Sequence, residues 1–202
     1  MTRRFVLLIA LAALLAGCAT RGPVTSDSAE RGPWQDQVAR VQALTSWTLA
    51  GKVGLHTANE STSANLDWRH TPNYYRLLIS GPFGAGRSTL EGTTQKVTLT
   101  TGEGRVSATS AEALLDQELG WSLPVSSLDH WIRGLPAPGD AFERKTDALG
   151  YPTQMRQDGW TIDYSDWMPA DGLWLPRRLA MQRPGIDATL IINAWQPEAK
   201  GE

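Results

Sequence analysis

The alternation that decides the fold of this chain runs through residues 47–55, WTLAGKVGL. Every second position in this stretch carries an apolar side chain or a glycine, namely Trp47, Leu49, Gly51, Val53 and Leu55. Successive side chains of a β-strand point to opposite faces of a sheet. The stretch is therefore predicted to be a strand with one face on the protein core, while Thr48, Ala50 and Lys52 point the other way.

More strands are predicted along the rest of the chain. Residues 64–68 repeat the alternation, and residues 73–80, NYYRLLIS, are apolar on both faces. Short runs of Thr, Val and Leu follow, separated by glycine-containing breaks, and further strands are expected toward the C-terminus. These segments are residues 88–91, 96–101, 105–108, 154–157, 160–164, 174–183 and 186–195. Closely spaced strands with glycine-rich turns are typical of antiparallel hairpins.

Three helices are predicted between and before the strands. The first spans residues 33–44, where apolar side chains recur at spacings of three and four, namely Trp34, Val38, Val41 and Leu44. The second, residues 109–120, starts with a capping box formed by Thr109 and Glu112, and the third spans residues 125–133. Since no strand–helix–strand period is present, the pattern predicts an α+β domain built on one long antiparallel sheet.

The N-terminus has the features of a bacterial lipoprotein signal peptide, residues 1–17. Its apolar run, residues 5–16, is shorter than the ~20 residues that a helix needs to cross a bilayer. The run ends in Leu15-Ala16-Gly17-Cys18, which resembles the lipobox of bacterial lipoproteins. In that motif the thiol is alkylated with diacylglycerol and the chain is cut before the cysteine. We therefore expect a covalent diacylglycerol and an N-acyl chain on Cys18, and no other cofactor.

The mature chain is predicted to begin with a flexible tether, residues 18–32, followed by a single domain, residues 33–202. The tether is rich in Gly, Pro, Ser, Asp and Arg and has hardly an apolar residue. Two or more acyl chains anchor a protein stably, whereas one chain is marginal. Ala19 stands where an Asp commonly retains lipoproteins in the inner membrane, so the outer membrane, with the domain facing the periplasm, is the expected location.

Composition and charge exclude several functional classes. Hydrophobic residues make up 41% of the 202 residues and charged residues 20%, which excludes a disordered acidic chain and a multi-span membrane protein. A net charge of −2 provides no basic footprint for nucleic acid. With one cysteine and three histidines, neither a disulfide framework nor a Cys/His metal centre is expected.

No catalytic constellation is evident in the sequence, so an enzyme is not expected. Residues 81–88, GPFGAGRS, come near a phosphate-binding loop, but the required lysine is replaced by Arg87 and the following residues are strand-like. Asp129 and His130 have serines nearby but no nucleophile elbow. Although tryptophan-rich proteins often stack sugars, no pair of carboxylates stands out for glycoside hydrolysis.

The nine tryptophans allow two interpretations of the domain's interior. An antiparallel barrel can enclose a ligand cavity, and strands of about eight to ten residues extend roughly 26–33 Å, enough for an acyl chain. The same tryptophans can instead fill a closed core. Composition alone leaves both interpretations open.

Three segments together resemble the LolB family of outer-membrane lipoprotein receptors, within the wider LolA/LolB-like group. They are residues 75–84, YRLLISGPFG, residues 119–124, LGWSLP, and residues 131–136, WIRGLP. The early Gly51-Lys52-Val53, the strands with Trp68, Trp160 and Trp195, and the lipobox occur in the same order. The resemblance covers essentially the whole mature chain.

The resemblance implies an incomplete antiparallel β-barrel of about eleven strands with a helical lid over an apolar cavity. It also implies a receptor, anchored in the outer membrane, that accepts lipoproteins from a LolA-like periplasmic carrier. The receptor would hold the acyl chains in the cavity and insert the lipoproteins among outer-membrane phospholipids. A monomer is expected, with outer-membrane lipoproteins as its cargo.

Two sets of site residues follow from this resemblance. The family carries an exposed apolar residue, usually Leu, at the tip of a protruding loop, and the matching position here is Phe83, flanked by Pro82 and Gly84. This loop is predicted to insert into the membrane. The predicted acyl-cavity lining comprises Trp47, Leu49, Val53, Tyr75, Leu77, Ile79, Leu114, Leu115, Leu128 and Trp131, of which about half are expected to touch ligand.

Two other functions remain as alternatives. The first is a structural scaffold lipoprotein of an outer-membrane complex, with its tryptophans packed into a solid core. The second is a sugar-binding or sugar-cleaving lipoprotein. Saturable binding of acyl chains would separate the receptor from the scaffold.

Overall fold

The computed structural model describes residues 30–59, 61–81, 84, 86–119, 123–139 and 141–198. Residues 31–202 form a compact unit of their own, distinct from residues 1–30. The predicted signal peptide, Cys18 and the tether up to residue 29 lie outside the described residues, as do Pro82 and Phe83.

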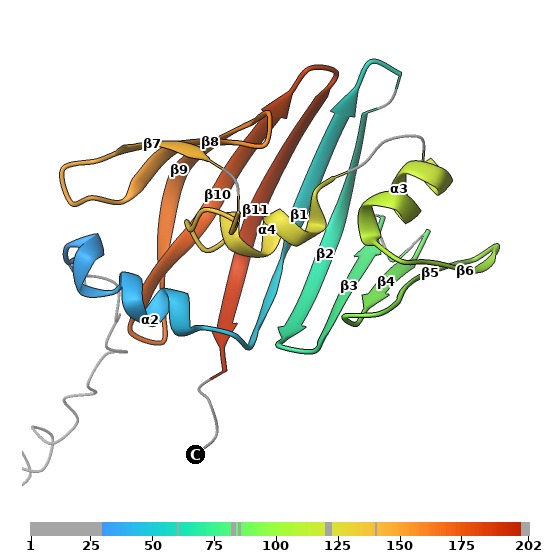
Figure 1. Ribbon diagram of the computed structural model, residues 1–202, viewed down its shortest axis with the longest axis horizontal. Helices are drawn as coiled ribbons and strands as arrows, with labels where there is room; N and C mark the ends of the chain where they lie inside the picture. Colours follow the sequence, from blue (N-terminus) through green and yellow to red (C-terminus); the bar gives the residue numbers. More distant parts are fainter. Residues whose placement is uncertain are drawn as a thin grey trace, which may run out of the picture. The chain divides into compact units, whose positions relative to one another are not determined.

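Eleven antiparallel strands form one open sheet (Figure 1). Its order is β6-β5-β4-β3-β2-β1-β11-β10-β9-β8-β7, so that the first and last strands pair at its centre. The strands are β1 (Trp47–Thr57), β2 (Ser61–Thr71), β3 (Tyr74–Ser80), β4 (Ser88–Gly92), β5 (Val97–Thr101), β6 (Gly104–Ala108), β7 (Phe142–Thr146), β8 (Pro152–Gln157), β9 (Trp160–Ala170), β10 (Leu173–Arg183) and β11 (Ile186–Pro197). The predicted α+β fold with an incomplete barrel of about eleven strands is confirmed.

Strand β1 shows why the sheet forms as the alternation predicts. Trp47, Leu49, Gly51 and Leu55 are buried and Val53 is half-buried, whereas Lys52 and His56 are exposed. The strand pairs with β2 on one side and with β11 on the other. Because one face is buried along the whole strand, a slip of one residue would expose the entire apolar set.

Among the described residues, four short helical segments accompany the sheet: the 3-10 turn η1 (Trp34–Asp36) and the helices α2 (Val38–Ala43), α3 (Ala111–Leu119) and α4 (Val125–Trp131). The first predicted helix is thus divided into a 3-10 turn and a six-residue helix. Between them the buried Gln37 amide donates to the Trp174 carbonyl (2.8 Å) and accepts from the Trp174 N–H (2.8 Å). These bonds to β10 fix the chain at the junction.

The predicted capping box of α3 is wrong in its details. Ser110, not Thr109, accepts the N–H of Ala113 through its hydroxyl (3.1 Å). The Glu112 carboxylate accepts from the N–H and hydroxyl of Ser126 in α4 instead (3.1 and 2.9 Å). The Glu112 carboxylate therefore makes a tertiary contact with α4 instead of capping its own helix as the sequence pattern predicts.

Strand β7 was not predicted. Its sequence, FERKT, is exposed at every position and has no buried face to produce an alternating pattern. As an edge strand it carries charges that discourage pairing with another chain.

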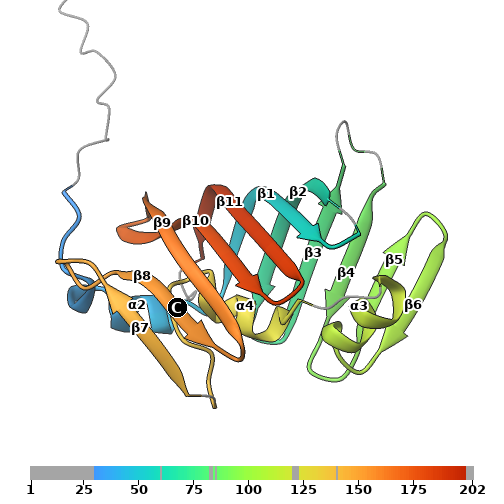
Figure 2. The same cartoon turned by 90° about the horizontal axis from the view of Figure 1, so that it is seen from above.

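The sheet bends around the helices α3 and α4, as the view from above shows (Figure 2). Its inner face carries the core, in which Trp47 packs edge-on against Trp68 (5.1 Å between ring centroids) and Trp195 (5.4 Å). Trp131 and Trp160 are also fully buried. The strands β1–β5 and the two helices then leave room for a cavity beside this aromatic core.

Candidate functional site

An apolar cavity of about 390 Å³ lies between strands β1–β5 and the helices α3 and α4. Its lining side chains are aliphatic or bear hydroxyls, apart from glycines, and none is charged. The lining residues are Val53, Leu55, Thr62, Ser63, Ala64, Leu77, Ile79, Gly81, Gly86, Ser88, Leu90, Leu99, Thr101, Leu115, Leu123, Val125 and Leu128. The volume lies in the range of small-ligand sites, roughly 300–1,000 Å³.

The floor of the cavity is a row of leucines that crosses the sheet. Leu77 of β3 pairs in register with Leu90 of β4, which pairs with Leu99 of β5. All three are buried. Because each occupies the same phase of its strand, the row follows directly from the two-residue period of the side chains.

The roof of the cavity is built by the two helices. Leu115 of α3 and Val125 and Leu128 of α4 face the strands across the cavity. The Glu112–Ser126 contact links the first turn of α4 to α3, so the two helices form a joined lid.

The structure places five of the ten predicted lining residues on this cavity: Val53, Leu77, Ile79, Leu115 and Leu128. The other five, Trp47, Leu49, Tyr75, Leu114 and Trp131, lie elsewhere. No tryptophan that the structure describes lines the cavity. The described tryptophans therefore serve the core, and that acyl chains occupy the neighbouring space stays a prediction.

The five predicted residues that do not line the cavity pack against other side chains. Trp47 stacks on His70 with ring planes 9° apart, and Leu49 pairs in register with the buried Trp68. The Trp131 indole donates to the buried Gln157 amide oxygen (2.8 Å), and Leu114 is fully buried.

Tyr75 packs over Gly92, its register partner on β4, because the glycine leaves room for the ring. Burial raises the pKa of its phenol to about 12, with a smaller contribution from the nearby Glu112 carboxylate. A phenol held neutral in this way serves packing rather than proton transfer.

Several lining residues were missed by the sequence analysis. Leu90 and Leu99 lie on short strands for which only the strand, and not the face, was predicted. Leu55 and Ala64 were assigned to alternating faces but not to the cavity. Alternation was the available signal, because each of the four is in phase with a buried neighbour on its strand.

Asp129 and His130 have a structural role. The buried Arg133 guanidinium donates to the Asp129 carboxylate (2.9 Å) and to the Leu44 carbonyl (2.9 Å). Burial, partly offset by the Asp129 charge, lowers the pKa of His130, so the imidazole is held neutral near pH 7. The cluster joins the end of α4 to the segment between α2 and β1.

Of the predicted membrane-insertion loop, only Gly84 is among the described residues. It is exposed with φ +80°, and its N–H donates to the Gly81 carbonyl (3.1 Å). Gly81 and Gly86 on either side of the loop line the cavity. The residues after it form strand β4 rather than a helix, so the near match to a phosphate-binding loop lacks the helix that such a loop needs.

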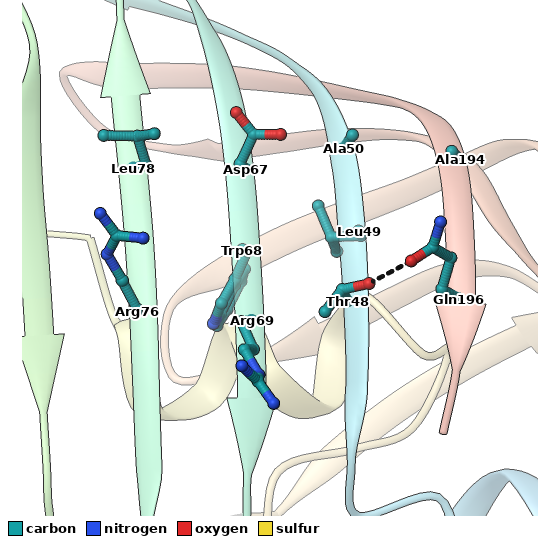
Figure 3. A pocket seen from close by; sticks show the side chains of 10 residues that line it. All are labelled: Thr48, Leu49, Ala50, Asp67, Trp68, Arg69, Arg76, Leu78, Ala194 and Gln196. Atoms are coloured by element: carbon teal, nitrogen blue, oxygen red, sulfur yellow. Dashed lines mark hydrogen bonds between the residues drawn. The ribbon is translucent and has the colours of Figure 1, made fainter. Parts of the chain in front are cut away.

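The outer face of the same strands differs from the inner one. It carries a shallow cleft of about 310 Å³ in which Thr48 and Gln196 hydrogen-bond to each other (Figure 3). Arg69 and Arg76 lie opposite each other in the register of β2 and β3, beside Asp67. This charged and polar surface is typical of a solvated sheet face.

Within the described part of the chain, no group of three or more His, Cys, Asp or Glu side chains could hold a metal ion. None of the helices described has both the length and the apolar character to cross a bilayer.

Comparison with known proteins places this geometry in context. The family described as "Outer membrane lipoprotein LolB" matches residues 45–195. An outer-membrane lipoprotein LolB from Chromohalobacter salexigens is 55% identical over 188 residues, covering 93% of this chain and 88% of the relative. A protein of the same name from Pseudomonas paraeruginosa is 39% identical over 204 residues and covers both chains completely.

Solved structures show the same fold in more distant proteins. A LolA superfamily protein from Nitrosomonas europaea superposes with a TM-score of 0.55 at 8% identity, covering 85% of this chain and 96% of that one. A DUF1329 family protein from Desulfovibrio piger gives the same TM-score, identity and coverage. At this identity the likeness concerns the fold alone.

Proposed function

This chain belongs to the LolB family of outer membrane lipoproteins, and on that premise we propose that it accepts lipoproteins from a LolA-like periplasmic carrier and inserts them into the outer membrane. Acyl chains on Cys18 would anchor it, as a monomer, with its domain facing the periplasm. The acyl chains of the cargo would occupy the apolar cavity before they pass to the phospholipid bilayer.

The uncharged cavity carries this proposal. Its walls are mostly aliphatic with some hydroxyl side chains, and the helices α3 and α4 face the strands across it. Burial of an acyl chain stabilises a complex by about 0.8 kcal/mol per methylene, so even a partly inserted chain is held firmly. Because a bilayer buries the same methylenes at least as well, release into the membrane needs no nucleotide.

The alternative of a scaffold with a solid core is less well supported. A scaffold does not require an uncharged cavity beside its aromatic core, and protein interiors are ordinarily close-packed with few voids. The sugar-binding alternative requires exposed aromatic faces with polar partners, whereas the cavity has no described tryptophan.

A cavity-filling substitution tests the proposal directly. Ala64 lines the cavity on β2, and Ala64→Phe would occupy the space with an apolar ring without burying a charge. Ala194→Phe places the same ring in the outer cleft on β11 and is the matched control. We expect Ala64→Phe to weaken acceptance of a lipoprotein from the carrier by about tenfold or more, since filling excludes the acyl chain.

The measurement is transfer of a radiolabelled lipoprotein from the carrier to each variant. Circular dichroism and a denaturation curve verify that both variants are folded. Equal transfer by the wild type and a folded Ala64→Phe variant would contradict the assignment of this cavity to acyl chains.

A further inference from the structure

Four hydroxyl residues line the apolar cavity, and three of them, Thr62, Ser88 and Thr101, lie at one end of it in phase with buried residues of their strands. The fourth, Ser63, is out of phase with the buried residues of β2. Thr62 is the second residue of β2, Ser88 the first of β4 and Thr101 the last of β5. Since neighbouring strands are antiparallel, these positions fall at the same end of the sheet. Each of these three hydroxyls lies in phase with an inward-facing residue of its strand, and all three residues line the cavity.

The rest of the cavity lining supplies little to compete with these hydroxyls. Toward the other end the walls are leucines, with Leu77, Leu90 and Leu99 in one row. Arg87, next to Ser88 in the chain, is exposed and is not part of the lining. The cavity thus passes from an aliphatic interior to a rim where the hydroxyls lie beside their register partners Leu55 and Ile79, and no charged side chain lines it.

The three hydroxyls have hydrogen-bonding capacity to spare. The Thr101 oxygen accepts the Glu103 N–H (3.2 Å), which leaves its own O–H free to donate. Within the described part of the chain, the side chains of Thr62 and Ser88 have no hydrogen-bond partner. Three O–H donors therefore border a space whose interior suits hydrocarbon.

We propose that Thr62, Ser88 and Thr101 form a specificity-determining rim that donates hydrogen bonds to the ester carbonyl oxygens where acyl chains join an uncharged glyceryl head. This inference rests on the proposed function, because it concerns which part of an acylated ligand lies at the mouth. A diacylglyceryl thioether, the modification expected on lipoproteins, presents such carbonyls and no charge. An anionic phospholipid presents the same carbonyls beside a phosphate for which the lining offers no cation, and burying an unpaired charge is costly.

The test compares two synthetic lipopeptides that differ only in the linkage of their chains. One carries an S-diacylglyceryl cysteine with ester-linked chains, and the other carries ether-linked chains, which lack the carbonyl oxygens. The protein is the full chain with Cys18→Ala, so that acyl groups of its own cannot compete for the cavity. Dissociation constants are measured by calorimetry, with phosphatidylglycerol as a third probe.

We expect the wild-type cavity to bind the ester-linked lipopeptide about tenfold more tightly than the ether-linked one, which corresponds to one or two hydrogen bonds. The triple variant Thr62→Val, Ser88→Ala, Thr101→Val should lose this preference and leave binding of the ether-linked lipopeptide within about twofold. Phosphatidylglycerol should bind more weakly than the ester-linked lipopeptide.

The matched control is Thr89→Val, Thr100→Val. These residues adjoin Ser88 and Thr101 on the same strands, pair with each other in register and do not line the cavity. The control should keep the full ester preference and so report any general effect of removing hydroxyls from these strands.

The outcomes separate this inference from the proposed function. Equal binding of the two lipopeptides, an equal loss of both in the triple variant, or tight binding of phosphatidylglycerol would overturn the hydroxyl rim while leaving an acyl-binding cavity. Absence of saturable binding by either lipopeptide would overturn the proposed function itself.

Discussion

Gly51 illustrates how a single residue sets the geometry at the centre of the sheet. It lies in β1 where the register with β11 shifts, between Ala50 and Gly51. A Cβ atom at this position would collide with the backbone carbonyl oxygen of Ile191 on β11. Since that oxygen belongs to the strand that joins the two halves of the sheet, the collision cannot be relieved by a rotamer change.

Gly51→Ala is therefore expected to destabilise the domain by about 1–3 kcal/mol, the usual range for overpacking. Gly54→Ala, on the same strand with nothing within 4 Å of its Cβ position, is the control. It should be neutral or slightly stabilising, because alanine has less backbone freedom to lose than glycine. Urea unfolding measures both, and equal stability of the two variants would refute the close-approach argument.

Helix α4 illustrates how a short element depends on its tertiary contacts. Its seven residues are too few for a stable isolated helix. The Glu112 carboxylate accepts the N–H of Ser126 in its first turn, and the Tyr164 hydroxyl donates to the Trp131 carbonyl in its last (3.0 Å). Beyond it, Arg133 bonds Asp129 and the carbonyl of Leu44. The lid of the cavity is thus held at both ends by polar contacts.

Removal of the Arg133 guanidinium should be costly. Arg133→Met leaves the Asp129 carboxylate and the Leu44 carbonyl without their partner, and we expect a loss of about 3–5 kcal/mol of stability. Arg177→Met breaks an exposed pair with Asp166 and should change stability by about 1 kcal/mol or less. Thermal or urea unfolding of the two variants gives the comparison. A loss for Arg133→Met no greater than that for Arg177→Met would mean that the cluster does not hold the helix.

The loop after β3 is predicted to act at the membrane. Phe83→Glu is expected to leave folding, anchoring and acceptance of lipoprotein intact but to block release to liposomes, whereas Phe83→Leu should be tolerated. The physical reason is that an inserted phenylalanine contributes roughly 1.5–3 kcal/mol, enough to orient the cavity mouth toward the bilayer but too little to anchor the protein. A two-step assay, carrier to receptor and then receptor to liposome, separates the effects. Release of cargo by Phe83→Glu at the wild-type rate would end the insertion hypothesis.

At the scale of the whole molecule, one sheet has a polar outer face and an inner face that carries both the core and the cavity. The outer face is polar and charged, as around Arg69 and Arg76. On the inner face, the aromatic side chains near Trp47 give the domain a dense core, while the strands β1–β5 surround the cavity. A binding space can persist because stability is supplied elsewhere in the same sheet.

The lipid anchor is predicted to act independently of this domain. Cys18→Ala should give a folded protein that is no longer attached to the membrane, because the variant lacks the thiol to which the anchoring acyl chains would be joined. Membrane fractionation after a high-salt wash, with a cleavable signal in place of the lipobox, measures the effect. Retention of the variant in the membrane fraction would show that another part of the chain binds the bilayer.

Much of the fold could be read from local patterns. The two-residue alternation around Val53 and the apolar stretch before Gly81 predicted β1 and β3, because a buried face of a strand requires apolar residues at regular positions in the sequence. Strand β7 is fully exposed and therefore has no such pattern. The ordered segments that resemble the LolB family predicted the incomplete barrel and its lid, and the family match confirms that resemblance.

The division between core and cavity was decided only by the tertiary structure. Trp47 and Val53 lie on the same face of the same strand, yet Trp47 meets Trp68, His70 and Trp195, whereas Val53 borders open space. Alternation determines which face a side chain occupies and carries no information about what packs against it. That depends on strands and helices far along the chain, which is also why the Glu112 carboxylate binds Ser126 of a neighbouring helix rather than capping its own.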